Sequence, residues 1–290
     1  KSMRTLIILG AGQFGRSFVS LVNRNQFRLL AFGDNNQTLW NTGLSTALGP
    51  VPVISVEQAA KLQPDLMLIA ISDETRTQAL MDQVVQAGYQ NSFLKLSDLS
   101  RILDIRSATL HRMAKRITEQ GIPGSIAELG VYRGDIAWQL NALFPERKLF
   151  LFDTFKGFDE KDVKTEKEHC FSRAEVQNFS DTSADYVKSR LPFPEQALFY
   201  PGYFPETTSG LPDRSFALVS LDTDLYEPIL AGLEYFYPKL SSGGMILLHD
   251  YNNTQFRGCK EAVRQYEKNN APLLLVPLSD LHGTAVIIKP

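Results

Sequence analysis

Residues 125–153 read SIAELGVYRGDIAWQLNALFPERKLFLFD. An apolar run at Ser125–Leu129 leads through a glycine-containing turn into a helical pattern over Asp135–Phe144, and a second apolar run follows at Leu149–Phe152. Two apolar runs joined in this way are typical of parallel strands connected by a helix that packs on their sheet. This stretch therefore predicts a doubly wound α/β sheet.

The same alternation continues to the end of the chain. Further strands are expected at Ala197–Tyr200, Phe216–Leu221 and Met245–Leu248, and further helices at Ala184–Arg190, Pro228–Leu240 and Cys259–Asn269. Two final apolar runs, Leu273–Pro277 and Thr284–Ile288, are separated only by a short polar loop. They predict an antiparallel pair at the edge of an otherwise parallel sheet.

The first hundred residues form a separate α/β pattern. Strands are expected at Thr5–Leu9, Leu29–Phe32, Val51–Ile54 and Asp65–Ile71, and helices at Gln13–Asn25 and Thr75–Ala87. Residues 104–120 interrupt this rhythm with one amphipathic helix, whose apolar face carries Leu110, Met113, Ala114 and Ile117. We therefore expect two Rossmann-like domains, residues 1–100 and residues 101–290, with this helix opening the second.

Composition excludes several classes of protein. The 290 residues contain 30 Lys and Arg against 32 Asp and Glu, so a net charge of −2 gives no reason to expect nucleic acid or membrane as a partner. No apolar run is long enough to span a bilayer, and the beginning of the sequence lacks the pattern of a secretory signal. With only Cys170 and Cys259 present, free thiols and a cytoplasmic location are expected.

The glycines Gly10, Gly12 and Gly15 follow the first strand and open a helix, and Asp34 comes at the end of the second strand. This context is typical of a dinucleotide-binding turn, with the acid on a ribose. The layout also resembles, over a short length, the N-terminal domains of sugar acetyltransferases, which hold a nucleotide-sugar. The alternative is a degenerate Rossmann fold used for packing or for association between subunits.

Acidic residues and one histidine follow the strand ends of the second domain. Glu128-Leu129-Gly130 ends the first strand, Asp153 the second, Asp222-Thr223-Asp224 another, and His249-Asp250 the next. Ligands of open α/β sheets bind at the carboxyl ends of the strands. The glycine turn with Asp153 predicts a ribose site, unless the glycines only form the turn and Asp153 caps it.

Asp222, His249 and Asp250 would meet above neighbouring strands. Two carboxylates and an imidazole at one place predict a divalent-metal site. In the alternative interpretation Asp250 caps a turn and His249 is a histidine at the edge of the core.

Four segments together resemble the macrocin O-methyltransferase (TylF-like) family over roughly residues 108–270. They are IPGSIAELGVYRGDIAWQLNALFPERKLFLFDTFKGFDEKD, YPGYFPET, LDTDLYEPILAGLEYFYPKLSSGGMILLHDY and GCKEAVRQY. The resemblance implies a class I methyltransferase sheet. It also implies an S-adenosylmethionine-dependent, divalent-metal-assisted O-methyltransferase that acts on a sugar hydroxyl of a glycan, nucleotide-sugar or secondary metabolite.

The resemblance also assigns roles to particular residues. Those implied at the methionine end of the cofactor are Glu128, Gly130, Tyr132 and Gly134. Asp153 would bind the ribose, and the residues implied around the adenosine are Thr154, Phe155, Gly157 and Phe158. Asp222 would be a metal ligand and Asp224 the general base.

The sequence departs from the family at one position. It reads His249-Asp250-Tyr251 where the family has two acids before the tyrosine. Imidazole suits Mn, Fe or Zn better than Mg, so the choice between Mg and Mn stays open. Without any metal, Asp224 or His249 would act as the base alone.

Two rival functions remain at this point. The first is an NAD(P)-binding oxidoreductase, although the first domain has no evident hydride-transfer residues such as a Tyr-xxx-Lys pair. The second is a non-catalytic nucleotide-binding relic, which only His249 supports. We expect a small-molecule or glycan substrate, and we leave association into a homo-oligomer open.

Overall fold

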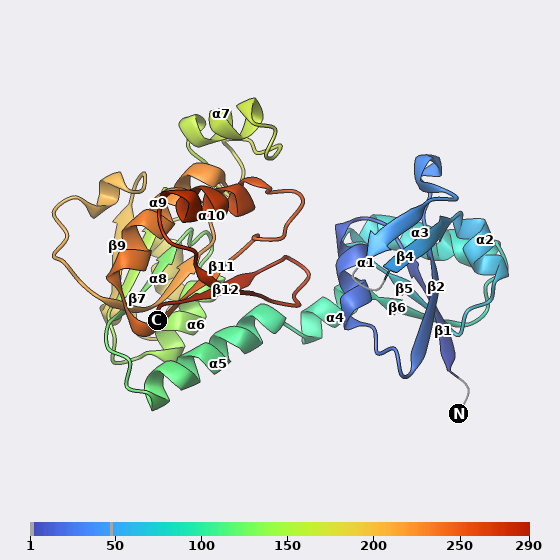
Figure 1. The fold of residues 1–290 in the computed structure, drawn as a ribbon, viewed down its shortest axis with the longest axis horizontal. Helices are drawn as coiled ribbons and strands as arrows, with labels where there is room; N and C mark the ends of the chain where they lie inside the picture. Colours follow the sequence, from blue (N-terminus) through green and yellow to red (C-terminus); the bar gives the residue numbers. More distant parts are fainter. Residues whose placement is uncertain (1–2, 47–48) are drawn as a thin grey trace. The chain divides into compact units, whose positions relative to one another are not determined.

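The structure, a computed structural model, describes residues 3–46 and 49–290. The chain divides into two units, one of Lys1–Asp104 with Ser279–Leu281 and the other of Ile105–Leu278 with His282–Pro290 (Figure 1). Among the described residues, no helix combines the length and the apolar character needed to cross a membrane.

The first unit has a six-stranded sheet in the order β3-β4-β2-β1-β5-β6. The strands are β1 (Arg4–Leu9), β2 (Phe27–Gly33), β3 (Gly43–Thr46), β4 (Gly49–Ile54), β5 (Leu66–Ile69) and β6 (Ser92–Lys95). All neighbouring pairs are parallel except β3 with β4, which is antiparallel. The sheet is therefore mixed at one edge.

Helices cover both faces of this sheet. They are α1 (Gln13–Phe18), α2 (Val56–Lys61), α3 (Glu74–Gln86) and α4 (Leu96–Ile102), with short 3₁₀ turns at Val19–Leu21 and Gln37–Leu39. Leu96 of α4 and the partly buried Phe14 and Phe18 of α1 contribute to one apolar core, and buried residues of α2 and α3 belong to the other. Local signals explain the boundaries of α3, because Asp73 caps its first turn and Gly88 follows its last with a φ of +93°.

The second unit has a seven-stranded sheet in the order β12-β13-β11-β10-β7-β8-β9. The strands are β7 (Ser125–Leu129), β8 (Leu149–Asp153), β9 (Ala197–Pro201), β10 (Phe216–Leu221), β11 (Leu240–Leu248), β12 (Leu274–Pro277) and β13 (Ala285–Ile288). The strands from β9 to β11 are parallel, and β13 runs antiparallel to both β11 and β12. This confirms the expected antiparallel edge.

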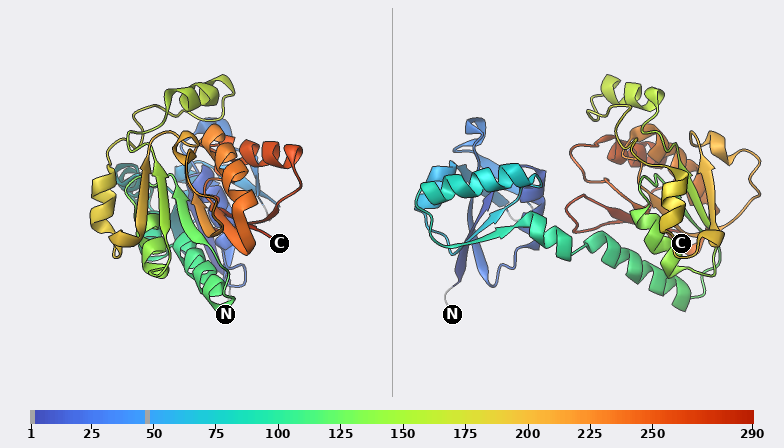
Figure 2. Two further views of the ribbon diagram at one scale, coloured as in Figure 1. Left: turned by 90° about the vertical axis from the view of Figure 1, so that its left-hand side faces the viewer. Right: turned by 180° about the vertical axis from the view of Figure 1, so that it is seen from behind.

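The helices of the second unit lie in layers on either side of its sheet (Figure 2). They are α5 (Ile105–Glu119), α6 (Asp135–Leu143), α7 (Glu160–Glu168), α8 (Ala184–Arg190), α9 (Tyr226–Phe236) and α10 (Gly258–Asn269), with 3₁₀ turns at Pro194–Gln196, Glu206–Thr208 and Tyr237–Lys239. Apolar residues of α5, α6 and α8 belong to one core, and those of α9 and α10 belong to the other. Two buried layers of this kind explain why the central strands are apolar on both faces.

The expected fold class, two doubly wound α/β sheets, is confirmed, while several element boundaries are wrong. The helix expected at Gln13–Asn25 ends as a 3₁₀ turn at Leu21, after which the chain reverses through hydrogen bonds to the Asn23 carbonyl. Strands β3 and β6 were not expected because their sequences, GLST and SFLK, contain only one and two apolar residues. Helix α7 was not expected either, because it is mostly charged and has little apolar periodicity.

Candidate active site

Strand register brings the predicted site residues to one edge of the second sheet. Leu129 of β7 pairs with Phe152 of β8 and with Leu221 of β10, and Leu221 pairs with Leu248 of β11. The residue directly after each of these paired positions is one that the sequence analysis selected: Gly130, Asp153, Asp222 and His249. Parallel pairing thus gathers residues that lie far apart in the sequence.

Gly130 permits a close approach between β7 and β10. It has a φ of +87°, and a Cβ atom at this position would lie 2.0 Å from the backbone oxygen of Asp222. The Asp222 N–H also donates to the Leu129 carbonyl at 2.9 Å. A side chain at position 130 would therefore separate the glycine turn from the segment that carries Asp222.

The Asp153 carboxylate holds the glycine turn in place. Its Oδ2 accepts N–H bonds from Val131 and Tyr132 at 2.7 and 2.8 Å, and its Oδ1 accepts one from Phe155 at 2.7 Å. A carboxylate oxygen accepts about two hydrogen bonds, so one acceptor position remains on Oδ1. Asp153 is therefore a structural acceptor as well as a candidate ligand-binding group.

A cavity of about 280 Å³ opens above these strand ends. The predicted residues that line it are Glu128, Gly130, Tyr132, Asp153, Thr154, Gly157, Phe158, Asp222, Asp224 and His249. Gly134 does not line it, since the position of its missing Cβ is occupied by Val187. Phe155 does not line it either, because its ring belongs to the apolar core beneath.

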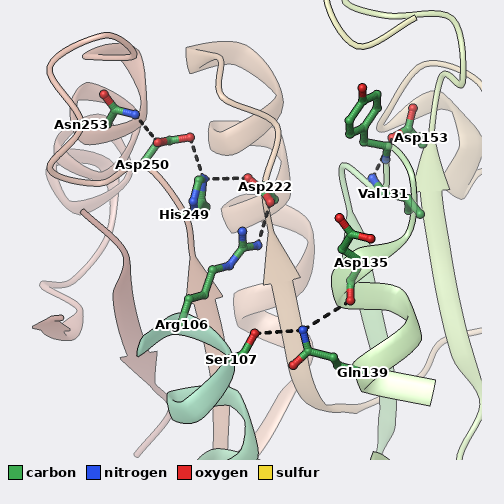
Figure 3. A network of polar contacts seen from close by, with 11 residues as sticks. Arg106, Ser107, Val131, Asp135, Gln139, Asp153, Asp222, His249, Asp250 and Asn253 are labelled. Atoms are coloured by element: carbon green, nitrogen blue, oxygen red, sulfur yellow. Dashed lines mark hydrogen bonds and ion pairs between the residues drawn. The ribbon is translucent and has the colours of Figure 1, made fainter. Parts of the chain in front are cut away.

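An ionic cluster forms one side of the cavity (Figure 3). His249 Nδ1 lies 2.9 Å from Asp222 Oδ1 and 2.7 Å from Asp250 Oδ2, and Asp222 Oδ2 accepts a bond from Arg106 Nη2 at 2.7 Å. Asn253 donates to the other oxygen of Asp250. One ligand atom from each of Asp222, Asp224, His249 and Asp250 lies within 4.8 Å of the others, a spacing that suits a single cation.

The charges of this cluster offset one another. Burial disfavours the charged form of Asp222, but Arg106 and His249 outweigh it and hold the pKa of this carboxyl below its usual range. Burial also opposes a charge on His249, but Asp222 and Asp250 outweigh it and raise the pKa of His249 to about 10. Burial and the hydrogen bond to Asp250 raise the pKa of Asp224 well above its usual value.

Glu128 differs from the other acids of the site. Its carboxylate is buried beneath the glycine turn, and its Oε2 has no hydrogen-bond partner among the described residues. Burial, followed by the neighbouring charge of Asp222, raises the pKa of Glu128 well above its usual value. The cavity thus contains a buried polar atom whose partner must come from a ligand or from water.

Several residues of the site were missed by the sequence analysis. Arg106 is the most important, and a signal for it exists: it lies four residues before Leu110, on the apolar face of α5. Asn253 and His282 were also missed, and the His282 ring centroid lies 5.6 Å from that of His249. No sequence pattern indicates those two contacts, because loops bring both residues to the cluster.

Asp162 and Tyr203 form a further polar pair in the cavity wall. Asp162 comes from α7, and its Oδ1 accepts a hydrogen bond from the Tyr203 hydroxyl at 2.8 Å. The Asp162 carboxyl is almost completely buried, and this burial raises its pKa to about 6.

The glycine turn of the first unit has a related construction. Asp34 Oδ2 accepts the Ala11 N–H at 2.7 Å, and its Oδ1 accepts the Asn36 N–H at 2.7 Å. A Cβ atom at Gly15 would lie 2.0 Å from the Gly10 oxygen, whereas one at Gly12 would meet no described atom within 4 Å. Gly15 is therefore required for packing, and the space beside Gly12 is open to a ligand.

Comparisons with known proteins agree with this geometry. The family model for macrocin O-methyltransferase (TylF) matches residues 96–289. The chain is 28% identical over 192 residues to the 8-demethyl-8-(2,3-dimethoxy-alpha-L-rhamnosyl)-tetracenomycin-C 4'-O-methyltransferase of Streptomyces olivaceus, covering 62% of this chain and 71% of that protein. It is 27% identical over 173 residues to the mycinamicin III 3''-O-methyltransferase of Micromonospora griseorubida, covering 56% and 67%.

Solved structures show a similar fold. The O-methyltransferase NovP has a TM-score of 0.52 and 23% identity, covering 63% of this chain and 79% of its own. The calicheamicin methyltransferase CalS11 has a TM-score of 0.51 and 21% identity, covering 80% of this chain and 91% of its own. At these identities the likeness concerns the fold.

The Asp162 carboxyl makes stability depend on pH in a defined direction. Its raised folded-state pKa means that folding disfavours its charge, so its unfavourable contribution grows as the pH rises from the ordinary value of 3.8 to about 6 and stays constant above that. We predict that Asp162→Asn, whose amide oxygen can still accept the Tyr203 bond, is more stable than wild type by about 1–2 kcal/mol at pH 8. The difference should close toward pH 4.

Urea unfolding of both proteins at pH 5, 6.5 and 8 measures this difference. Asp185→Asn, on the exposed first turn of α8, is the matched control for the loss of one carboxylate. A difference that is the same at all three pH values would contradict the assignment.

Proposed function

The chain belongs to the macrocin O-methyltransferase (TylF) family, and we propose from this premise that it transfers a methyl group from S-adenosylmethionine to a hydroxyl group of a sugar. The observation that carries the proposal is the row of acids around one cavity at the carboxyl ends of the strands. The matched residues 96–289 contain every member of that row. A sugar acceptor is proposed because one relative is named for its action on a rhamnosyl compound.

The cavity suits the proposed cofactor. Asp153 keeps one acceptor position for a ribose hydroxyl, and Glu128 Oε2 is a buried atom that needs a partner. Tyr132, Phe158 and Phe179 form a line of edge-to-face aromatic contacts in the cavity wall, which offers apolar surface to a purine ring. When bound, S-adenosylmethionine supplies a methyl group on a sulfonium sulfur.

Asp224 is the proposed general base in its ionised form, whereas burial and its hydrogen bond to Asp250 favour the protonated form in the ligand-free site. It lines the cavity, whereas Asp250 lies behind His249 and does not. A sugar hydroxyl is a poor nucleophile with a pKa far above neutrality, so a carboxylate must accept its proton as the oxygen attacks. Methyl transfer is an in-line displacement, and Gly130 favours it by keeping the turn on β7 close to the acidic segment after β10.

Asp222, His249 and Asp250 are the proposed ligands of a divalent cation. Their ligand atoms lie close enough to share one ion, and Asn253 already orients Asp250. A bound cation would supply positive charge that favours the oxyanion form of the acceptor. Coordination requires the neutral imidazole of His249, so a bound cation would have to displace the proton that Asp222 and Asp250 favour on this ring. A neutral imidazole favours Mn or a later transition metal over Mg.

The first unit is proposed to bind a nucleotide or a nucleotide-sugar. Two observations support this proposal. The space beside Gly12 is open, and each carboxylate oxygen of Asp34 accepts only one backbone hydrogen bond among the described residues. Both oxygens can therefore still accept ribose hydroxyls. NAD(P) remains the rival ligand for this turn.

The catalytic assignment is tested by Asp224→Asn. We predict a fall in kcat of roughly 10²- to 10⁴-fold, because the amide cannot accept the proton, while calorimetry shows binding of S-adenosylhomocysteine within about threefold of wild type. The assay follows labelled methyl transfer to rhamnosyl and other sugar acceptors. Asp213→Asn, an exposed acid paired with Lys239, is the control.

Two results would count against these assignments. An unchanged kcat in Asp224→Asn would show that Asp224 is not the general base. A wild-type protein that binds neither S-adenosylmethionine nor its product would remove the proposed function.

The metal assignment is tested by His249→Asp, which restores an all-carboxylate set. We predict that wild type binds Mn²⁺ at least roughly tenfold more tightly than Mg²⁺, and that the substitution narrows or reverses this preference. Isothermal calorimetry on the cofactor-free protein measures both affinities. His111→Asp, on the exposed side of α5, should change neither, and failure of wild type to bind either ion would refute the site.

The ligand of the first unit is tested by Gly12→Val. A nucleotide-sugar such as UDP-glucose should raise the melting temperature of this unit in wild type and not in the variant, because the valine fills the space beside the turn. Ser20→Val, exposed nearby, is the control. A shift with NADH alone would favour the rival ligand, and no shift with any nucleotide would leave the turn a packing element.

A further inference from the structure

Arg106 is a buried cation whose hydrogen-bonding capacity is largely unused. Its side chain is only 15% exposed, it lines the cavity, and its Nη2 donates to Asp222 at 2.7 Å. Its Nε is buried and has no partner among the described residues. Guanidinium carries five N–H donors in a rigid fork, so this group can hold a second anion while it keeps its bond to Asp222.

The position of Arg106 is fixed by neighbouring contacts. The next residue, Ser107, accepts a hydrogen bond from Gln139 of α6 at 2.9 Å, which joins the first turn of α5 to the helix that follows the glycine turn (Figure 3). Arg106 lines the same cavity as Glu128 and pairs with Asp222 of the ionic cluster. It therefore lies between the floor of the cofactor cavity and the acids of the reaction site.

The other cations in the cavity wall are already occupied. Arg133 is half-exposed and pairs with Asp181 across the surface. His249 directs its Nδ1 at two carboxylates. The first residue of α6 is the acid Asp135, which opposes an anion at that helix start. Of the described residues lining the cavity, Arg106 is thus the buried cation with an unpartnered donor.

The proposed cofactor has one anionic group to place there. Its amino-acid end carries an ammonium, a sulfonium and a carboxylate, and the acidic cavity suits the two cations but repels the carboxylate. We propose that Arg106 binds this carboxylate through its free guanidinium edge, while the same side chain orients Asp222 beside the acceptor. This inference rests on S-adenosylmethionine being the cofactor.

A pair of ligands that differ only in the carboxylate tests the proposal by calorimetry. Wild type should bind S-adenosylhomocysteine roughly 10- to 100-fold more tightly than the same compound without its carboxylate. Arg106→Met should weaken binding of the first ligand by a similar factor and leave the affinity for the second within about threefold. Arg106→Lys, which keeps the charge and loses the fork, should give an intermediate result.

Two controls separate recognition from a structural role. Arg133→Met makes the same change at the exposed arginine of the cavity and should preserve discrimination between the two ligands. Asp222→Asn weakens the ion pair with Arg106 but leaves the guanidinium in place. This variant should therefore still bind S-adenosylhomocysteine more tightly than the compound without its carboxylate. Melting temperatures of all variants report whether each is folded.

The outcomes distinguish this inference from the proposed function. If wild type binds neither ligand, the cofactor assignment fails. If wild type binds both ligands equally, or if Arg106→Met weakens both equally, the cofactor assignment stands and the role of Arg106 is overturned. The comparison of the two ligands on wild type can overturn the role of Arg106 by itself, even if Arg106→Met folds poorly.

Discussion

The candidate site depends on the contacts that Asp222 makes with Gly130, Arg106 and His249. The backbone oxygen of Asp222 occupies the place where Gly130 would carry a side chain, and its carboxylate binds Arg106 on one oxygen and His249 on the other. The first contact ties β10 to the glycine turn after β7, and the second ties it to α5 and β11. Because one residue makes both contacts, cofactor pocket and ionic cluster share a wall and cannot shift independently.

In both units an acidic side chain stabilises the tight glycine turn. An acid at the end of the second strand, Asp34 in one unit and Asp153 in the other, accepts a backbone N–H from the residue after the first glycine at 2.7 Å. Charge-assisted bonds of this kind are stronger than neutral ones, so the turn is held before any ligand binds. Such an acid therefore shapes the turn and keeps only its remaining acceptor positions for a sugar hydroxyl.

The sequence predicted the parts of the site that regular pairing brings together. The carboxyl ends of parallel strands lie at one edge of a sheet, so Asp222, His249 and Asp250 were expected to meet there. It did not predict contacts that cross between layers: Arg106 reaches Asp222 over 116 positions, from a helix that precedes the sheet. Phe155 was expected at the cofactor, but its ring belongs to the apolar core and does not line the cavity. Strands β3 and β6, with one and two apolar residues, and the charged helix α7 carry too little apolar patterning to be recognised.

Helix α5 determines where a fragment that contains the second sheet has to begin. This helix precedes the first strand of the second sheet, and a fragment starting at β7 would contain every strand of that sheet and every acid of the candidate site. Such a fragment would nevertheless lack Arg106 and Ser107, and with them the counter-charge of Asp222 and the tether to α6. A fragment that keeps the candidate site complete therefore has to include the first turn of α5, and an expression boundary chosen from the sheet alone would remove part of that site.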